Sequence, residues 1–446
     1  MRWIMSVIDE IFSDGERRPL IVSDDGTIDF WSTLYVTAEL RSDGKQTTIK
    51  KELYSIKLIR TWEHSTGRDL LEEFRRQKLL DKDTIRSIKD FCLLSAKKGS
   101  RKSKKVVNFT RLAKIESPLN TVDKTYQYQR MLGINHYLEF CAWEICKFKP
   151  NASELRDNID KMVILFKSHY PKGLSNISKV THAEASAFEH FMQVIRTGHE
   201  DNPFKNFDTQ LRNYLQIAIL YWTGCRPSEV LALTLDDIIH DIDEPKLCFI
   251  RRHDDINDPR PLQPTLKTQE RDIEIPPALY SDLEYYIRKV RSNYKLSKTH
   301  PYIFISQKGE SSGIAMSDKN FSSGVMAPLK EVSKSFENIQ RRGFRIYFNE
   351  RFSDQVDKHN AKISKQIQEA EARGGETENI KRLEEQIIRD GKEIDTRMRI
   401  MGHSSPTSSR TYLDRRVTRI AKKIHKEMML DTSATVREIK DARKEK

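Results

Sequence analysis

A short stretch rich in Gly, Ser and Asn, from Lys172 to Lys179, divides this sequence into two parts. Such a composition is typical of a connecting segment and unlike that of a helix or a strand. On both sides of it, apolar residues recur at the three- and four-residue spacing of amphipathic helices. With 446 residues, about three times the ~150 residues of one domain, the chain is expected to form two or three domains, with a boundary at this stretch.

The part before this stretch is predicted to be a helical domain preceded by a short cap. Residues 1–30 combine a short apolar run with turn-rich Asp-Gly segments, which is typical of short strands and loops. Residues 31–175 are then expected to be helical. Helical spacing is clear from Ser32 to Cys92, from Thr121 to Cys146 and from Ala152 to Phe166.

Residues 97–105 form a strongly basic segment inside this first domain. Six of the nine residues are Lys or Arg, and none has an apolar side chain, so a loop is predicted. A solvated linker is one interpretation. Contact with the phosphates of a nucleic acid is favoured, because the whole chain is also basic. The candidate DNA-binding residues are Lys97, Lys98, Arg101, Lys102, Lys104 and Lys105.

The part after the connecting stretch mixes helices with a few strands. A helix is expected from His182 to Ile195, with Thr181 as its N-cap, and another from Thr209 to Trp222. Short alternating or apolar runs predict strands at Leu247–Arg251, Asp272–Ile275 and Tyr302–Ser306. The predicted fold class is therefore mostly α with a small antiparallel β-sheet (α+β). The second domain would cover residues 181–430, followed by a charged tail at 431–446.

The charge balance restricts the partners of the chain. Lys and Arg number 78 against 65 Asp and Glu, a formal net charge of +13, which favours nucleic acid as the partner, with an acidic membrane surface as the alternative. No apolar run approaches the ~20 residues that span a bilayer. The five cysteines are scattered without a Cys-x-x-Cys pair, which favours a reducing cytoplasm and argues against a disulfide framework or a zinc site.

The most informative motif follows the apolar helix that ends near Trp222. Gly224 suits the left-handed residue after a helix, and Pro227 suits the first position of the next one. Arg226 is therefore predicted at a helix N-terminus, where backbone N–H groups already favour an anion, with Glu229 within reach. A guanidinium there could grip phosphate oxygens. Taken alone, an ordinary Arg–Glu cap pair is the more common explanation.

Three further motifs follow in the second part, each ordinary when taken alone. Lys267 precedes a short alternating strand. Arg342 and Arg345 lie in an Arg-Arg-Gly-Phe-Arg segment beside an apolar, aromatic face. His403 precedes Ser-Ser-Pro, which is typical of a helix start, and Tyr412 follows nine residues later.

Taken in order, the segments TGCRPSE, LKTQERDIEIP, RRGFR, MGHSSP and TY resemble the tyrosine recombinase (phage-integrase) family. The resemblance covers about His182 to Lys426, and the first part looks like that family's helical core-binding domain. The stretch from Arg251 to Arg260 resembles integrases encoded by mobile elements. The resemblance implies these roles: Arg226 and Arg345 as catalytic arginines, Arg342 as the first residue of the box that ends at Arg345, Lys267 as the hairpin lysine, His403 as the catalytic histidine, Tyr412 as the nucleophile and Glu229 as a support for Arg226.

The implied activity is site-specific recombination of double-stranded DNA through a 3′-phosphotyrosine intermediate. Two arginines would neutralise the phosphodiester, and Lys267 would protonate the leaving 5′ oxygen. The covalent bond conserves the energy of the phosphodiester, so no ATP, metal or other cofactor is expected. The implied partners are a dimer on each DNA site, a tetrameric synapse and possible accessory recombination proteins, in the cytoplasm on the bacterial nucleoid.

One position departs from the family. Its usual box is His-x-x-Arg, but here the first residue is Arg342, which can donate hydrogen bonds but cannot shuttle a proton near neutral pH. This departure favours one alternative, a DNA-binding accessory protein that has lost activity. A monomeric type IB topoisomerase, which shares the chemistry, is another.

The 58 positions between Arg345 and His403 exceed the short connection of the family. Apolar residues at helical spacing on both sides of Gly374-Gly375 predict a coiled-coil hairpin insertion at about 354–396, with two arms of roughly 20 residues. A disordered charged insertion is the alternative. If the hairpin forms, it would contact a protomer, an accessory protein or flanking DNA and do no chemistry. The stripe consists of Val356, Ile363, Ile367, Ala370, Ile380, Leu383, Ile387 and Ile394.

Overall fold

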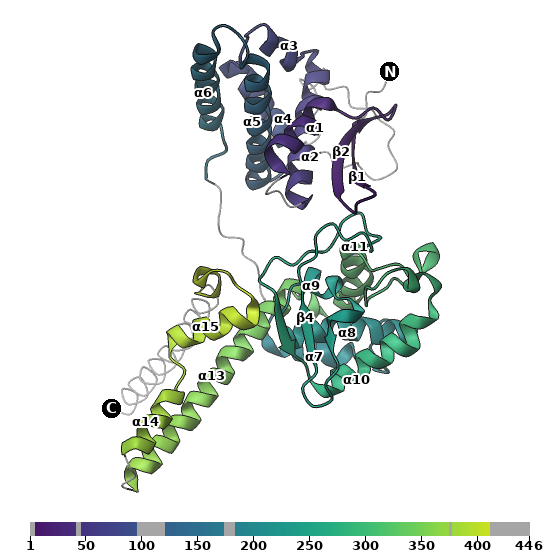
Figure 1. Cartoon of the computed structure of the whole chain (residues 1–446), viewed down its shortest axis with the longest axis vertical. Helices are drawn as coiled ribbons and strands as arrows, with labels where there is room; N and C mark the ends of the chain where they lie inside the picture. Colours follow the sequence, from purple (N-terminus) through teal and green to yellow (C-terminus); the bar gives the residue numbers. More distant parts are fainter. Residues whose placement is uncertain (1–4, 42–45, 96–120, 174–182, 374–376, 411–446) are drawn as a thin grey trace, which may run out of the picture. The chain divides into compact units, whose positions relative to one another are not determined.

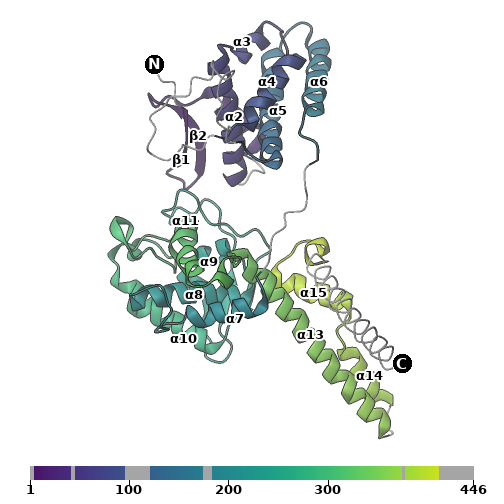
Figure 2. The same ribbon diagram turned by 180° about the vertical axis from the view of Figure 1, so that it is seen from behind.

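The computed structural model describes residues 5–41, 46–95, 121–173, 183–373 and 377–410. The chain divides into two compact units, Met1–Lys179 and Val180–Lys446. Figure 1 and Figure 2 show that helices dominate both units and that each contains one small sheet. The predicted fold class, mostly α with small antiparallel sheets, is confirmed. No described helix is long and apolar enough to cross a membrane.

The first unit is a helical bundle beside a two-stranded sheet. Strands β1 (Met5–Ile11) and β2 (Arg17–Ser23) pair antiparallel, and α2 packs against both of them. The central helix α5 contacts α1, α2, α3, α4 and α6. The helices are α1 (Phe30–Tyr35), α2 (Gln46–Thr66), α3 (Leu70–Arg75), α4 (Lys82–Leu93), α5 (Lys124–Cys146) and α6 (Ala152–Ser168).

Aspartates start several of these helices. Asp69, Asp81 and Asp123 each accept a hydrogen bond from a backbone N–H in the first turn, which satisfies a donor that has no partner inside the helix. The apolar faces that follow meet around buried aromatic residues such as Phe74 and Phe166. The basic segment 97–105 lies outside the described residues.

The second unit surrounds α8 (Phe207–Thr223), a helix buried along most of its length. Strands β3 (Ile238–Ile239), β4 (Lys246–Phe249) and β5 (Arg271–Glu274) form an antiparallel sheet in the order β3-β4-β5. Short 3₁₀ and π segments connect or extend the helices. The other helices are α7 (Ala185–Val194), α9 (Pro227–Ala232), α10 (Pro277–Tyr285), α11 (Asp318–Phe321), α12 (Ala327–Val332), α13 (Arg341–Ala372), α14 (Thr377–Gln386) and α15 (Asp390–Met401).

Two predicted elements of this unit are corrected. Tyr302–Ser306 does not form a strand. It makes only isolated bridges, Thr234 with Tyr302 and Ile305 with Ala315, because its buried side chains sit among helices and loops without a neighbouring strand. Helix α7 begins later than predicted: its N-cap is Glu184 and not Thr181, which lies outside the described residues.

Helices α13, α14 and α15 form an antiparallel hairpin that projects from the second unit (Figure 1). The outgoing arm is the later part of the 32-residue α13, which ends at Ala372 as a first arm of about 20 residues from residue 354 requires and which also carries Arg345. The prediction of one continuous return arm is incorrect, because this arm breaks into α14 and α15. At the break, the side chain of Asn360 hydrogen-bonds both the carbonyl and the N–H of Ile388, at 2.8 and 2.9 Å. The described residues of the apolar stripe are buried or half-buried.

Candidate active site

Arg226 occupies the N-cap of α9, between the end of α8 and the first helical residue, Pro227. Its backbone N–H donates to Glu229 Oε2 at 3.0 Å, and its Nη1 lies 3.3 Å from Glu229 Oε1. The capping box thus restrains the backbone and the guanidinium together. The Arg226 side chain remains one-third exposed, at 33%, which leaves part of it accessible to a ligand.

Glu229 is a buried carboxylate that hydrogen-bonds with several residues around Arg226. Besides Arg226, it accepts hydrogen bonds from Thr268 Oγ1 at 2.9 Å and from Arg271 Nη2 at 2.8 Å. Burial by itself would raise the pKa of Glu229. The charge of Arg271 and the hydrogen bonds from Arg226 and Arg271 outweigh burial, so the pKa lies below its usual value and the carboxylate is charged.

Arg271 is a site residue that the sequence analysis missed. It begins β5, and its side chain joins three segments: Nη1 donates to Thr268 Oγ1 at 2.8 Å, Nη2 to Glu229, and Nε to the carbonyl of Ile400 in α15 at 2.9 Å. The guanidinium also lies over the ring of Phe249, 4.7 Å from its centre. A signal existed in the sequence, since Arg271 has the same strand phase as Ile273 and so faces the side where an apolar residue is expected.

Arg345 is buried on α13 and connects the ends of two other helices. Its Nη1 donates to the carbonyl of Gly224 at 2.9 Å, and its Nη2 donates to the carbonyl of Met401 at 3.2 Å. Carbonyls at helix C-termini lack partners inside the helix and favour a cation. Gly224 has a φ of +60°, and a Cβ there would lie 2.5 Å from the Phe348 ring, so only glycine lets α8 end this close to α13.

His403 follows α15, which ends at Gly402 in the left-handed conformation. The N–H of Gln269 donates to the Gly402 carbonyl at 2.8 Å, so the His403 segment is docked on the strand that Arg271 begins. Arg345 Nη2 lies 2.8 Å from His403 Nε2, and His403 Nδ1 lies 2.8 Å from Ser409 Oγ. Because a guanidinium can only donate, Nε2 must accept. The proton of the neutral imidazole therefore sits on Nδ1 and points to Ser409.

The pKa of His403 is lowered to about 4. Burial is the main cause, and the positive charges of Arg345, Arg226 and Arg271 add to it, while Glu229 opposes it. The imidazole is therefore neutral at physiological pH. Both predicted catalytic arginines thus act on the His403 imidazole, Arg345 by direct contact and Arg226 through its charge.

This lowered pKa makes stability depend on pH in a defined direction. The unfolded chain binds a proton at His403 below pH ~6.5, but the folded chain does so only near pH 4, so acid favours unfolding. Between pH 7 and 4.5 we expect His403 to remove at most about 3 kcal/mol from the free energy of unfolding. Denaturant unfolding of wild type and His403→Gln at both pH values measures this, because other groups cancel in the difference. Equal acid losses in the two proteins would contradict it.

Lys267 is exposed on the connection between β4 and β5. It directly precedes Thr268, whose hydroxyl is hydrogen-bonded to Glu229. The backbone of Lys267 is thus anchored next to the arginine cluster while its side chain reaches the surface. The long connection, from residue 250 to residue 270, brings this lysine to the start of β5.

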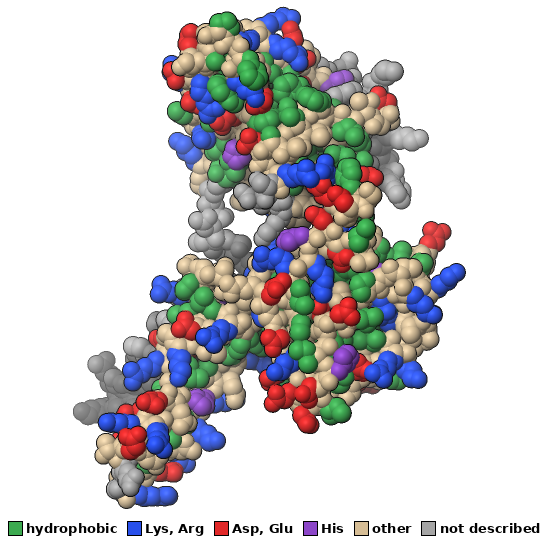
Figure 3. All heavy atoms as spheres, viewed as in Figure 1, with side chains coloured by type: hydrophobic (Ala, Val, Ile, Leu, Met, Phe, Trp, Pro, Cys, Tyr) green, Lys and Arg blue, Asp and Glu red, His purple; other side chains and the backbone are tan. Residues whose placement is uncertain are grey.

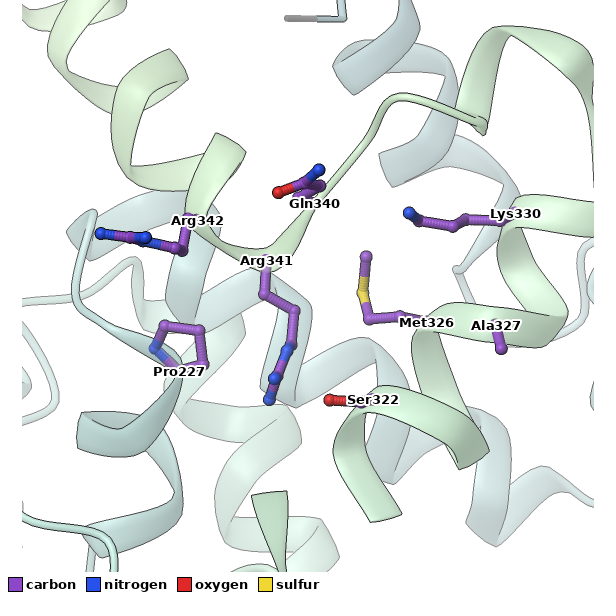
Figure 4. A pocket seen from close by; sticks show the side chains of 8 residues that line it. All are labelled: Pro227, Ser322, Met326, Ala327, Lys330, Gln340, Arg341 and Arg342. Atoms are coloured by element: carbon purple, nitrogen blue, oxygen red, sulfur yellow. The ribbon is translucent and has the colours of Figure 1, made fainter. Parts of the chain in front are cut away.

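Arg342 is exposed on the first turn of α13, three residues before Arg345. It lines a surface pocket of about 350 Å³ together with Pro227, the residue after Arg226. Figure 4 shows Arg341 and Arg342 extending in different directions, with Arg342 pointing away from Lys330. Arg341 is ion-paired with Asp318 at 2.6 Å. The pocket lining comprises Pro227, Ser322, Met326, Ala327, Lys330, Gln340, Arg341 and Arg342.

The predicted nucleophile, Tyr412, lies outside the described residues. Residues 406–410 are helical and begin with Pro406, as the Ser-Ser-Pro signal predicts. The neighbouring Arg226 and Glu229 meet Arg345 and His403, which come from distant parts of the sequence, in one hydrogen-bonded and electrostatic cluster. Lys267 and Arg342 lie at its exposed border.

Three solved structures resemble the chain, each with 14% sequence identity. The XerH site-specific recombinase bound to palindromic difH substrate in a post-cleavage complex matches 68% of this chain and 78% of its own, with a TM-score of 0.37. The pre-cleavage XerH complex with difH matches 65% and 79%, with a score of 0.34. The XerA recombinase matches 86% and 91%, with a score of 0.31. No protein-family model and no curated protein sequence matches.

Proposed function

We propose that this protein is a tyrosine-type site-specific DNA recombinase of a mobile genetic element. It cuts and rejoins DNA strands through a 3′-phosphotyrosine formed by Tyr412, without metal or ATP. The observation that carries the proposal is the meeting of Arg226, Arg345 and a neutral His403 around the buried Glu229. A fixed pair of guanidinium groups is suited to a phosphodiester anion.

The two arginines perform the electrostatic part of the reaction. Arg226 and Arg345 neutralise the non-bridging oxygens of the scissile phosphate, which otherwise repel an attacking oxygen. The Tyr412 oxygen then forms a bond to phosphorus while the bond to the 5′ oxygen breaks. Rejoining is the reverse step, in which a 5′-hydroxyl attacks the phosphotyrosine and Tyr412 leaves.

Two protons have to move in this step. The tyrosine hydroxyl loses one as it attacks, and the leaving 5′ oxygen gains one. Lys267, exposed next to Thr268, is the general acid for the leaving oxygen. His403 is the remaining imidazole near the arginines, and a bound phosphate would raise its pKa by offsetting the charges of Arg345 and Arg226 that lower it. Arg342 contributes hydrogen bonds to the phosphate but no proton transfer.

The DNA-binding part of the proposal adds the basic segment of the first unit and assembly on DNA. Its basic side chains contact DNA phosphates, and two protomers bind each site before four protomers form a synapse. Accessory recombination proteins are possible further partners. The chain's net charge of +13 supports a polyanionic partner.

Replacing the six basic residues of segment 97–105 by Gln should weaken binding to all DNA sequences to a similar degree. The slope of log affinity against log salt is negative, and each lost phosphate contact makes it shallower by ~0.9, so the loss of six contacts would make it shallower by about 5. Fluorescence anisotropy on specific and random duplexes between low and moderate salt measures the slope. An unchanged slope would show that the segment is only a linker.

Formation of a covalent protein–DNA adduct tests the activity. The probes are duplexes with sequences taken from the DNA that flanks the gene of this protein. Each duplex carries a nick near the cleavage site, so that the short cleaved fragment dissociates and the adduct accumulates. A protease-sensitive band that carries the upstream part of the cut strand, with its original 5′ end, under denaturing conditions supports the proposal, because the protein is then joined to the new 3′ end at the cut. Binding of these duplexes without any adduct would overturn it.

That second outcome would instead support a DNA-binding accessory protein that kept the fold and lost cleavage. Arg342 at the first position of the Arg-Gly-Phe-Arg box favours this alternative, because the resembled family usually has a histidine there, whose imidazole can transfer a proton. An Arg342→His variant separates the two functions. Adduct formation only in this variant would mean that the natural chain is impaired at that one residue.

A further inference from the structure

A buried polar contact closes the base of the hairpin, outside the cluster that binds phosphate in the proposed function. Arg397 on α15 is 1% exposed, although it carries a charge. Its Nη1 donates to the Asn349 side-chain oxygen at 2.7 Å and to the Asn349 carbonyl at 3.1 Å, and its Nη2 donates to Ser353 Oγ at 2.7 Å. Its Nη2 also forms an ion pair with Glu393, which is likewise buried.

These contacts continue directly into the candidate active site. On α13, Arg345, Asn349 and Ser353 follow each other at four-residue steps and share one face of the helix. On α15, Glu393, Arg397 and Met401 do the same, and the two rows face each other in antiparallel order. Ser353 meets Glu393, Asn349 meets Arg397, and Arg345 meets Met401.

Asn349 connects the Arg397 contacts at the base of the hairpin with the Arg345–Met401 contact next to the candidate active site. While its oxygen accepts from Arg397, its Nδ2 donates to the Arg345 carbonyl at 2.7 Å and lies 3.7 Å from Met401 Sδ. Met401 in turn accepts from Arg345, and His403 follows two residues later. A shift of α15 along α13 would therefore break the Arg397 contacts and the Arg345–His403 contact together.

A buried ion pair is a weak way to stabilise a protein, since well-packed apolar residues in the same place are often as stable. Directional hydrogen bonds, however, allow only one register between two helices, which apolar contacts do not enforce as strictly. Between residue 354 and Arg399, positive and negative side chains are mixed on the surface of the hairpin (Figure 3). The outer part of the hairpin therefore has no strong electrostatic field of one sign. The polar contacts at the base of the hairpin therefore fix the alignment of α15 on α13.

We propose that Arg397 and Glu393 are positioning residues for strand cleavage: by locking the register of α15 on α13, they hold His403 against Arg345 and separate the active site from movements of the outer hairpin. This role rests on the proposed recombinase function. The outer hairpin, residues 357–392, contains none of the four residues Asn349, Ser353, Glu393 and Arg397. It is therefore free to contact a neighbouring protomer or an accessory protein during assembly.

The test replaces the pair by apolar residues of similar size, in the double variant Glu393→Leu/Arg397→Met. Thermal unfolding should occur within a few degrees of wild type. Single-turnover cleavage of the nicked duplex should slow by about 10²-fold, as expected for misplaced reacting groups, while the Kd for DNA stays the same. Lys392→Met, which changes an exposed residue of the same helix, should cleave like wild type. If the double variant does not fold, Ser353→Ala removes one Arg397 partner and should slow cleavage several-fold.

A second measurement, the protonation of His403, does not depend on cleavage activity. NMR titration of the His403 ring should find it neutral at pH 5 in wild type and protonated in the double variant, because a displaced imidazole loses its burial and its contact with Arg345. Wild-type cleavage together with an unchanged titration would overturn the positioning role, and so would equal losses of cleavage and DNA affinity. If wild type forms no adduct with any duplex, the recombinase proposal fails, and the titration alone decides whether the pair positions His403.

Replacing residues 357–392 by a short Gly/Ser linker completes the test. Because the base contacts remain, this variant should cleave a half-site at the wild-type rate and fail to assemble on paired sites. Loss of half-site cleavage in the folded deletion variant would show that the outer hairpin belongs to the active site and is not separated from it.

Discussion

Tyr412→Phe is expected to abolish the covalent DNA adduct while DNA binding stays nearly intact. The substitution removes a single oxygen, which is the proposed nucleophile, and little else. In enzymes that work through a covalent intermediate, such a loss lowers the rate by several orders of magnitude, here by at least about 10⁴-fold and so below detection in the adduct assay. The measurement compares adduct formation on the nicked duplex with a Kd from fluorescence anisotropy.

Tyr347→Phe is the matched control, since it removes the same atom from a buried tyrosine that donates to Glu189 in the second unit. It should form the adduct at a rate close to that of wild type. An adduct formed by Tyr412→Phe would show that another residue is the nucleophile, and peptide mapping of the linked DNA would identify it.

Arg345→Lys should lower the rate of cleavage by about 10²- to 10³-fold, the usual effect of removing one preorganised donor to a transition-state oxyanion. Lysine keeps the charge but cannot contact the Gly224 and Met401 carbonyls and His403 in the planar arrangement of a guanidinium. The Kd for DNA should change far less than the rate. Single-turnover kinetics at saturating protein measures the rate separately from binding.

Arg382→Lys provides the comparison for this second prediction. Its side chain is 73% exposed on α14, far along the hairpin, so the same chemical change there should leave cleavage at the wild-type rate. If Arg345→Lys cleaves as fast as this control, the proposed clamp of two arginines is wrong, and the buried position of Arg345 has a structural purpose only.

Much of the local structure around the site could be predicted because it depends on neighbours in the chain. The left-handed Gly224, the N-cap position of Arg226 and the Glu229 contact all lie within six consecutive residues, and each follows from cap geometry. The apolar stripe of the hairpin likewise follows from helical periodicity. The break between α14 and α15 could not be predicted from this periodicity, because it depends on the contact of Asn360 with Ile388 across the hairpin.

The sequence by itself determined the order of the helices, the ends of those with clear caps and the residue types available for chemistry. These properties arise from backbone conformation and from contacts over a few residues. Only the tertiary structure decided which of those residues meet. Arg271 reaches Ile400 over 129 positions, and Arg345 reaches Gly224 over 121, so no local pattern encodes either contact. Burial and charge are also properties of the packed chain: His403 becomes a neutral imidazole because folding removes it from water and places three arginines around it.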